Sequence, residues 1–145
     1  MQALARLRAL SPRARALLAE ALIGLGLASM AVALLPFRTL GRLAAHPLSA
    51  KPPSDEQALI TSVGWAVRAG ARRVPFRAKC FEQGLAAWLM LRRRGINATI
   101  HYGVARERDN LIAHVWVTAD DRDVIGCENK DGFAELVRFP APSAD

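Results

Sequence analysis

The chain has 145 residues, of which 52% are hydrophobic and 23% charged, so it can bury the core of one domain. This composition excludes a disordered tail or a collagen-like fibre. The formal net charge is +7, from 20 lysines and arginines against 13 aspartates and glutamates. Two cysteines are too few for a disulfide scaffold, and no signal-peptide pattern opens the sequence. We therefore expect a cytoplasmic protein in a reducing compartment.

Residues 1–46 form a helical N-terminal segment ahead of a core predicted over 47–145. The uncharged run 21–37 is at the lower limit of the roughly 17–25 residues that span a bilayer, and Pro36 ends it. The arginines before this run would favour the cytoplasmic side if it touched lipid. A helix packed on the rest of the protein is the favoured interpretation, and membrane contact through 16–37 is the alternative.

Two amphipathic helices are predicted next. Ser54-Asp-Glu-Gln57 gives a capping box, and apolar residues recur at helical spacing from there to Gly70. Pro75 interrupts the pattern, and a second helix runs over 80–94 and ends before Gly95.

Three strands follow, because the hydrophobic period changes to two. Residues 96–104 alternate as a strand with one buried face, and His101 falls on its polar face. A second strand over 111–119 carries His114, and a third starts at Val124. Helices ahead of an antiparallel sheet define an α+β fold class.

Positive charge is concentrated in residues 68–94, which hold seven arginines and one lysine against one glutamate. This stretch could meet an acidic peptide, a nucleic acid or anionic lipid. Arg92, Arg93 and Arg94 precede a predicted helix end, where the helix dipole stabilises cations. A solvated helix terminus is therefore the simpler interpretation of that triplet.

Cys80 is a candidate nucleophile because it opens a predicted helix. Unpaired backbone N–H groups and the positive end of the dipole favour a thiolate there, and Lys79 and Arg77 add positive charge. The alternative is that Cys80 is a small buried hydrophobe, as free cysteines often are.

His114 is the candidate base. A histidine within a strand is commonly a satisfied interior residue, but a thiol and an imidazole from separate elements can meet at hydrogen-bond distance. His46, in the N-terminal loop, and His101, on a polar face, are weaker candidates.

The acid that would orient His114 is ambiguous between Asp123 and Glu128. A three-residue turn over 120–122 places Glu128 opposite His114, whereas a two-residue turn places Cys127 there. Asp123 is the commoner residue type for this role but lies nearer the turn. Both carboxylates stay candidates.

No metal or cofactor is expected. Cys80, Cys127, His101 and His114 lack the paired spacings of a zinc site. There is no phosphate loop, no dinucleotide fingerprint and no serine-hydrolase elbow.

Three blocks in this order resemble the B2-type lasso-peptide leader peptidases, a branch of the transglutaminase-like cysteine proteases. They are KCFEQGLAAWLMLRRRGI at 79–96, HYGV at 101–104 and AHVWV at 113–117. The resemblance implies a papain-like arrangement in which the cysteine helix packs on an antiparallel sheet bearing histidine and acid. It makes Cys80 the nucleophile and His114 the general base. The family's acid lies in the strand after the histidine, where this chain has no aspartate at the corresponding place.

The resemblance also implies a function, which is removal of the leader from a ribosomally made precursor peptide through an acyl-enzyme. The implied partners are the precursor at its leader–core junction, a separate leader-recognition protein and the lasso cyclase, with no nucleic acid. The alternative is a non-catalytic module of the same fold that holds an acidic peptide or nucleic acid. Such a module would keep binding without Cys80.

Overall fold

The computed structural model describes residues 1–44 and 51–140, so His46 lies outside the described residues. Within these ranges the chain forms five helices, four strands and one short 3₁₀ turn. In chain order they are α1 (Gln2–Ala9), α2 (Pro12–Leu34), α3 (Phe37–Ala44), α4 (Glu56–Ala71), α5 (Cys80–Arg92), β1 (Ala98–Glu107), β2 (Asn110–Ala119), β3 (Arg122–Ile125), η1 (Lys130–Gly132) and β4 (Ala134–Phe139).

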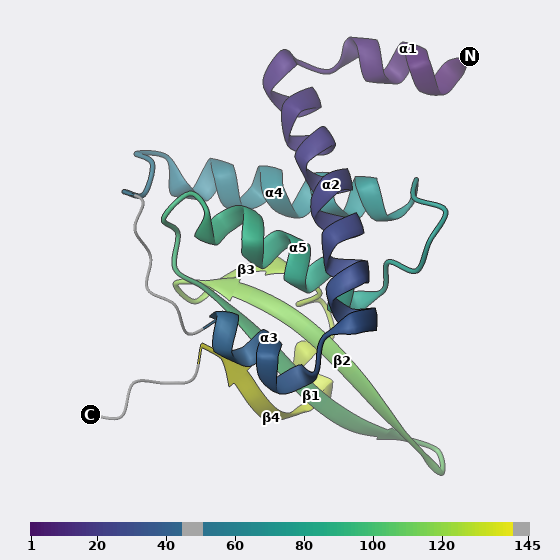
Figure 1. The fold of residues 1–145 in the computed structure, drawn as a ribbon, viewed down its shortest axis with the longest axis vertical. Helices are drawn as coiled ribbons and strands as arrows, with labels where there is room; N and C mark the ends of the chain where they lie inside the picture. Colours follow the sequence, from purple (N-terminus) through teal and green to yellow (C-terminus); the bar gives the residue numbers. More distant parts are fainter. Residues whose placement is uncertain (45–50, 141–145) are drawn as a thin grey trace.

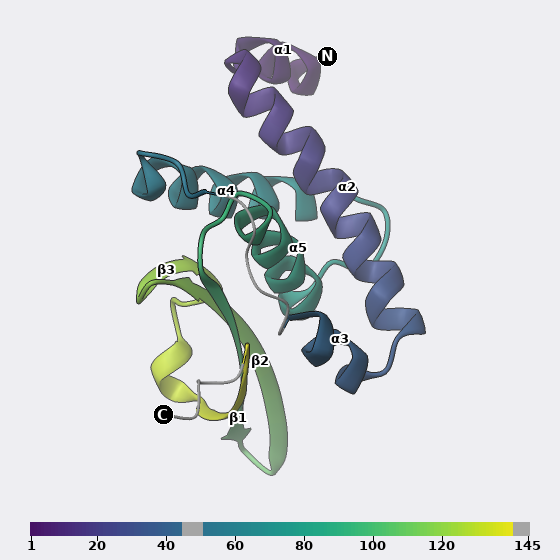
Figure 2. The same ribbon diagram turned by 60° about the vertical axis from the view of Figure 1, so that its left-hand side comes forward.

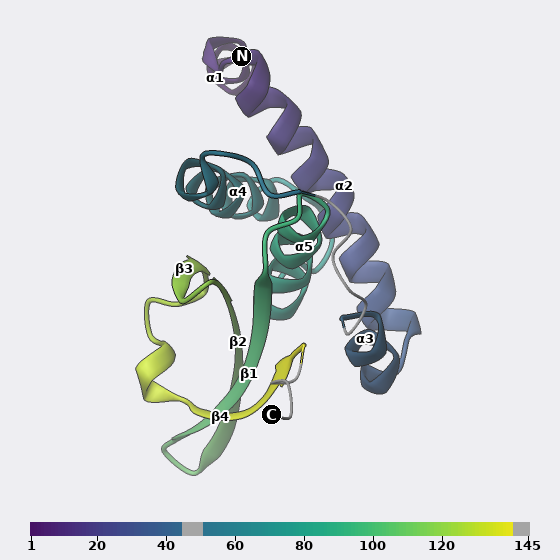
Figure 3. The same ribbon diagram turned by 90° about the vertical axis from the view of Figure 1, so that its left-hand side faces the viewer.

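The four strands form one antiparallel sheet in the order β3-β2-β1-β4, and the long helices lie on one of its faces. Figure 1 shows α2 crossing α4 and α5, and Figures 2 and 3 show α5 between α2 and the sheet. Helix α4 packs beside α5 and over β3. The predicted α+β class is confirmed.

Helix α2 packs on α4 and α5 along one side only. It starts at Ser11, whose Oγ accepts a hydrogen bond from the Ala14 N–H, and it ends before Pro36. By length and composition it could cross a membrane, but 33% of its apolar window is buried inside the fold. Its buried residues are Leu17, Leu18, Ala21, Gly24, Leu25 and Ala28, of which Leu17, Ala21, Leu25 and Ala28 belong to the common hydrophobic core. The opposite side of α2 is exposed.

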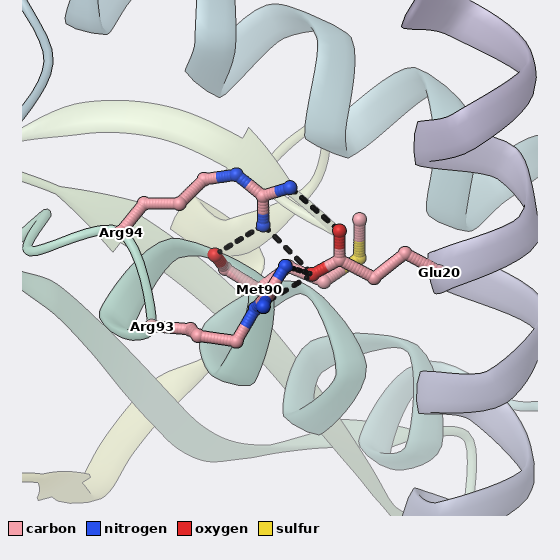
Figure 4. Close-up of polar contacts among 4 residues, drawn as sticks. All are labelled: Glu20, Met90, Arg93 and Arg94. Atoms are coloured by element: carbon pink, nitrogen blue, oxygen red, sulfur yellow. Dashed lines mark hydrogen bonds and ion pairs between the residues drawn. The ribbon is translucent and has the colours of Figure 1, made fainter.

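An ion-pair cluster fastens α5 to α2 (Figure 4). Both oxygens of Glu20 bind the Arg94 guanidinium, with Nη1–Oε1 at 2.7 Å and Nη2–Oε2 at 2.5 Å, and Arg93 adds a bond at 3.2 Å. The hydrogen bond from Arg94 holds the pKa of Glu20 below its usual value, although burial opposes this. A solvated helix terminus is therefore the wrong interpretation of Arg94. Its guanidinium is paired with Glu20, which lies 74 positions earlier in the chain, and its side chain is only 23% exposed.

Both core helices begin or end close to the predicted positions. The N-cap of α4 is Asp55, whose Oδ1 accepts from the Ala58 N–H at 3.2 Å, so the predicted cap at Ser54 is wrong by one residue. Helix α5 ends at Arg92, and Gly95 has a φ of 77°, which only glycine adopts without strain.

The turn from β2 to β3 has two residues, Asp120 and Asp121, with φ of 47° and 64°. It is followed by a bulge: Thr118 pairs with Asp123, whereas Val117 pairs with Ile125. Val124 is thus one extra residue in β3. Beyond the bulge, β3 therefore pairs with β2 in the same register that a three-residue turn without a bulge would give.

His101 is buried, which corrects its predicted position on a polar face. Its Nδ1 lies 2.6 Å from Glu135 Oε1 and its Nε2 lies 2.9 Å from Thr118 Oγ1, and the ring stacks on Trp116. Burial alone would raise the pKa of Glu135, but hydrogen bonds from His101 and Arg138 outweigh it and lower the pKa. The sequence pattern did not predict β4, the strand that supplies Glu135 and covers this side of His101.

Candidate active site

A small pocket opens between the start of α5 and the edge of β2, at the point where β3 has ended. Its volume is about 210 Å³. The lining residues are Arg68, Cys80, Gln83, His114, Val115, Ile125, Gly126 and Glu128. The structure therefore brings together three of the four predicted site residues and leaves Asp123 outside.

Cys80 is the first residue of α5, and the residue before it, Lys79, has an extended backbone and no side-chain cap. The preceding loop is held because Gln83 Nε2 donates to the Ala78 carbonyl at 2.8 Å and the Gln83 N–H donates to the Lys79 carbonyl at 2.9 Å. The thiol is half-buried at the positive end of the helix dipole. Arg77 is less available than the sequence implied, because it pairs with the buried carboxylate of Glu82 at 3.5 Å.

His114 is oriented by a backbone carbonyl. Its Nε2 lies 2.6 Å from the carbonyl oxygen of Gly126, and its ring packs against Phe133 and Trp116. A carbonyl can only accept a hydrogen bond, so Nε2 must carry the proton. In the neutral imidazole, Nδ1 is then the unprotonated nitrogen that can take a proton from a thiol.

Gly126, whose carbonyl bonds to His114, is not among the site residues predicted from the sequence. Its φ is 74°, and a Cβ there would lie 2.7 Å from the Val115 carbonyl oxygen and 3.5 Å from His114 Nε2. Only glycine satisfies both the backbone conformation and the close approach. A glycine inside a predicted strand often marks a close approach of another backbone segment, so the sequence did contain an indication of this contact.

Neither candidate carboxylate bonds to His114 among the described residues. Asp123 binds Lys130 Nζ at 2.5 Å, and its side chain is 55% exposed. Glu128 lines the same pocket as His114. The three-residue turn predicted to place it opposite His114 is not observed, although the bulge at Val124 gives the same register at the pair Val117 and Ile125.

Cys127 is buried, and its thiol donates to the Val117 carbonyl at 3.3 Å. Burial, reinforced by the negative charge of Asp123, raises the pKa of this thiol. Cys127 is thus a poor nucleophile. Among residues 1–44 and 51–140, no three His, Cys, Asp or Glu side chains gather where they could hold a metal ion.

A thiol at the start of a helix that packs on an antiparallel sheet, with an imidazole of that sheet in the same pocket, defines a thiol–imidazole site on an α+β fold. A family model described as Transglutaminase-like superfamily matches residues 21–138, and the chain belongs to that superfamily. The matched region contains Cys80 and His114. No curated protein and no solved structure matches the chain. The superfamily commonly comprises cysteine peptidases and transferases.

Proposed function

We propose that this chain is a cysteine peptidase that cuts the leader from a ribosomally made lasso-peptide precursor. The observation that carries the proposal is the pocket shared by Cys80 and His114, in which the Gly126 carbonyl fixes the proton on Nε2 of the imidazole. The sequence blocks that resemble the B2-type leader peptidases contain both residues. Membership of the transglutaminase-like superfamily supports the coarser part of the proposal.

In this mechanism Nδ1 of His114 takes the thiol proton, and the sulfur of Cys80 attacks the scissile carbonyl carbon. The negative charge that develops on the substrate oxygen is stabilised by the backbone N–H of Cys80 at the helix start. The carbon–nitrogen bond then breaks, and the imidazolium returns its proton to the leaving amine. Water, deprotonated by Nδ1, attacks the thioester, the carbon–sulfur bond breaks, and the substrate leaves as its acid; the imidazolium returns its proton to the sulfur of Cys80. Throughout, the Gly126 carbonyl accepts from Nε2–H and stabilises the imidazolium.

A second pocket, which shares no lining residue with the pocket of Cys80, would suit a peptide substrate. It has a volume of about 460 Å³, and Phe81, the neighbour of Cys80, is part of its wall. Its lining is almost wholly apolar: Val32, Leu35, Leu40, Phe81, Tyr102, Leu136 and Val137. We propose that this pocket takes an apolar side chain of the precursor near the cleaved bond. A separate leader-recognition protein would present the precursor, and the lasso cyclase would take the released core.

The test is a cleavage assay that uses, as substrate and partner, a short precursor peptide and a small leader-binding protein sought among the genes next to this chain's gene. Mass spectrometry should show two fragments with the wild-type chain and none with Cys80→Ala or His114→Ala, because groups that act as one unit fail together. Cys127→Ala is the matched control and should cleave.

Other products would assign other functions. A fragment carrying a transferred amine in place of a new carboxylate would indicate a transferase. An intact precursor that binds the wild-type chain and Cys80→Ala equally would indicate a binding module, the non-catalytic alternative for an acidic peptide.

A further inference from the structure

The outward side of α2 carries a row of large apolar side chains that nothing in the described fold covers. Ile23, Leu27, Met30 and Leu34 are 65%, 57%, 59% and 73% exposed. Their spacing puts them on one side of the helix, opposite the buried residues, over about 16 Å of its length. Helix α2 is thus apolar on both sides, whereas a helix with one side in water normally carries polar and charged residues on that side.

Phe76 extends this apolar surface beyond the helix. It lies in the α4–α5 loop, is 39% exposed, and would be in contact with a Cβ added at Gly26. A shallow hollow between the loop and the helix is lined by Ile23, Gly26, Leu27, Ser29, Met30 and Phe76. We call Ile23, Leu27, Met30, Leu34 and Phe76 together the α2 face.

Every charged residue of the loop 72–79, and every charged residue of α2 other than Glu20, is positive. Arg13 and Arg15 lie toward the N-terminus of α2 and form no ion pair among the described residues. Arg15 is eight residues, or about two helical turns, before Ile23. On the loop side, Arg72 precedes Phe76 and is exposed. The only carboxylate of α2, Glu20, is already taken by Arg93 and Arg94, as Figure 4 shows. An apolar centre with a cationic rim is complementary to the surface of an anionic bilayer.

We propose that the α2 face docks the protein on an anionic lipid bilayer, with α2 lying in the plane of the interface. A membrane-spanning position is incompatible with this fold, because Ala21, Leu25 and Ala28 are fully buried in the core formed with α4 and α5. Figure 3 shows α2 along one flank of the molecule, with α5 and the sheet on its other side. None of the residues that line the pocket of Cys80 belongs to the α2 face.

The experiment is sedimentation of the full chain with vesicles of phosphatidylcholine alone or of equal parts phosphatidylcholine and phosphatidylglycerol. The wild-type chain should sediment with the anionic vesicles, and added salt should release it. Leu27→Gln with Met30→Gln should weaken binding at least tenfold, since glutamine keeps helix propensity but removes the apolar contact. Arg13→Gln with Arg15→Gln should weaken it by about 25-fold, at roughly fivefold per basic residue.

Leu111→Gln is the matched control, because Leu111 is 72% exposed in the hairpin far along the chain from α2. It should bind like the wild type, and circular dichroism should show every variant folded. Failure of the wild type to bind anionic vesicles would overturn the proposal, as would equal binding to neutral ones or unchanged binding by the Leu27/Met30 variant. A dimer that this variant dissociates, without vesicle binding, would instead make the α2 face an interface between copies. Cys80→Ala should not change binding, so this result is independent of the proposed peptidase.

Discussion

Replacing Gly126 with alanine is the most informative single change at the candidate site. The residue holds a φ of 74°, which costs a non-glycine residue about 1–2 kcal/mol. The added Cβ would also lie 2.7 Å from the Val115 carbonyl oxygen, and relieving such a contact in packed surroundings costs about 1–3 kcal/mol. We therefore expect Gly126→Ala to lower the free energy of unfolding by roughly 2–5 kcal/mol while the protein stays folded.

The same substitution should damage the site more than it damages the fold. Relief of the contact moves the Gly126 carbonyl, which is the hydrogen-bond acceptor of His114 Nε2. A displacement of about 1 Å in a catalytic group can cost on the order of 10²-fold in rate. We expect precursor cleavage to fall by about that factor, beyond any loss that reduced stability explains.

Urea unfolding followed by tryptophan fluorescence measures the stability effect, and the cleavage assay measures the rate. Gly132→Ala is the matched control, because nothing lies within 4 Å of a Cβ at Gly132. It should match the wild type in both measurements. If Gly126→Ala were as stable and as active as Gly132→Ala, the carbonyl would have no part in positioning His114.

The remaining predictions concern the thiols, the α2–α5 contact and the two carboxylates. Cys127, buried and with a raised pKa, should react with iodoacetamide only after denaturant is added, while Cys80 reacts in the folded protein; early reaction of both would contradict the site. Glu20→Gln should destabilise the fold by about 1–2 kcal/mol at neutral pH. Because the pKa of Glu20 is lowered in the folded protein, its contribution to stability is present above the unfolded-state pKa and is lost as the pH falls through the folded-state pKa. The free energies of unfolding of the wild type and Glu20→Gln, measured in urea, should therefore become equal in acid. Asp123→Asn should leave cleavage unchanged, and Glu128→Gln should reduce it less than about tenfold, because no carboxylate bonds to His114 within residues 1–44 and 51–140. A loss of orders of magnitude for either would restore that residue as the orienting acid.

Local patterns in the sequence were sufficient for α2, α4 and α5, for the first three strands and for the α+β class, whereas the separate helices α1 and α3 were not predicted. Helical spacing ended by Pro36 and by Gly95 marks boundaries that depend on neighbouring residues alone. Cys80 and His114 could be chosen for the same reason, since a helix start and a strand face are local properties. The cap of α4 was wrong by one residue because Ser54 and Asp55 are both good caps, and only the structure shows which side chain bonds to the helix.

The parts that the sequence could not predict depend on contacts between distant segments. Strand β4 pairs with β1 across the sheet, and without it His101 could not be recognised as buried. The acceptor of His114 is a main-chain carbonyl, which no side-chain motif reports. Its position depends on the two-residue turn and the bulge at Val124 acting together. Arg94 likewise finds its partner, Glu20, only when α2 folds onto α5.

The central claim is that Cys80 and His114 form one thiol–imidazole unit, and it can be tested without knowledge of the substrate. The measurement is the rate of iodoacetamide alkylation of Cys80 near neutral pH, in the wild type and in His114→Ala, read by mass spectrometry with Cys127 as the internal reference. We expect fast alkylation in the wild type and a rate at least about tenfold lower in His114→Ala, with the circular dichroism spectrum unchanged. Equal rates in the two folded proteins would show that the imidazole does not act on the thiol, and the proposed chemistry would be wrong.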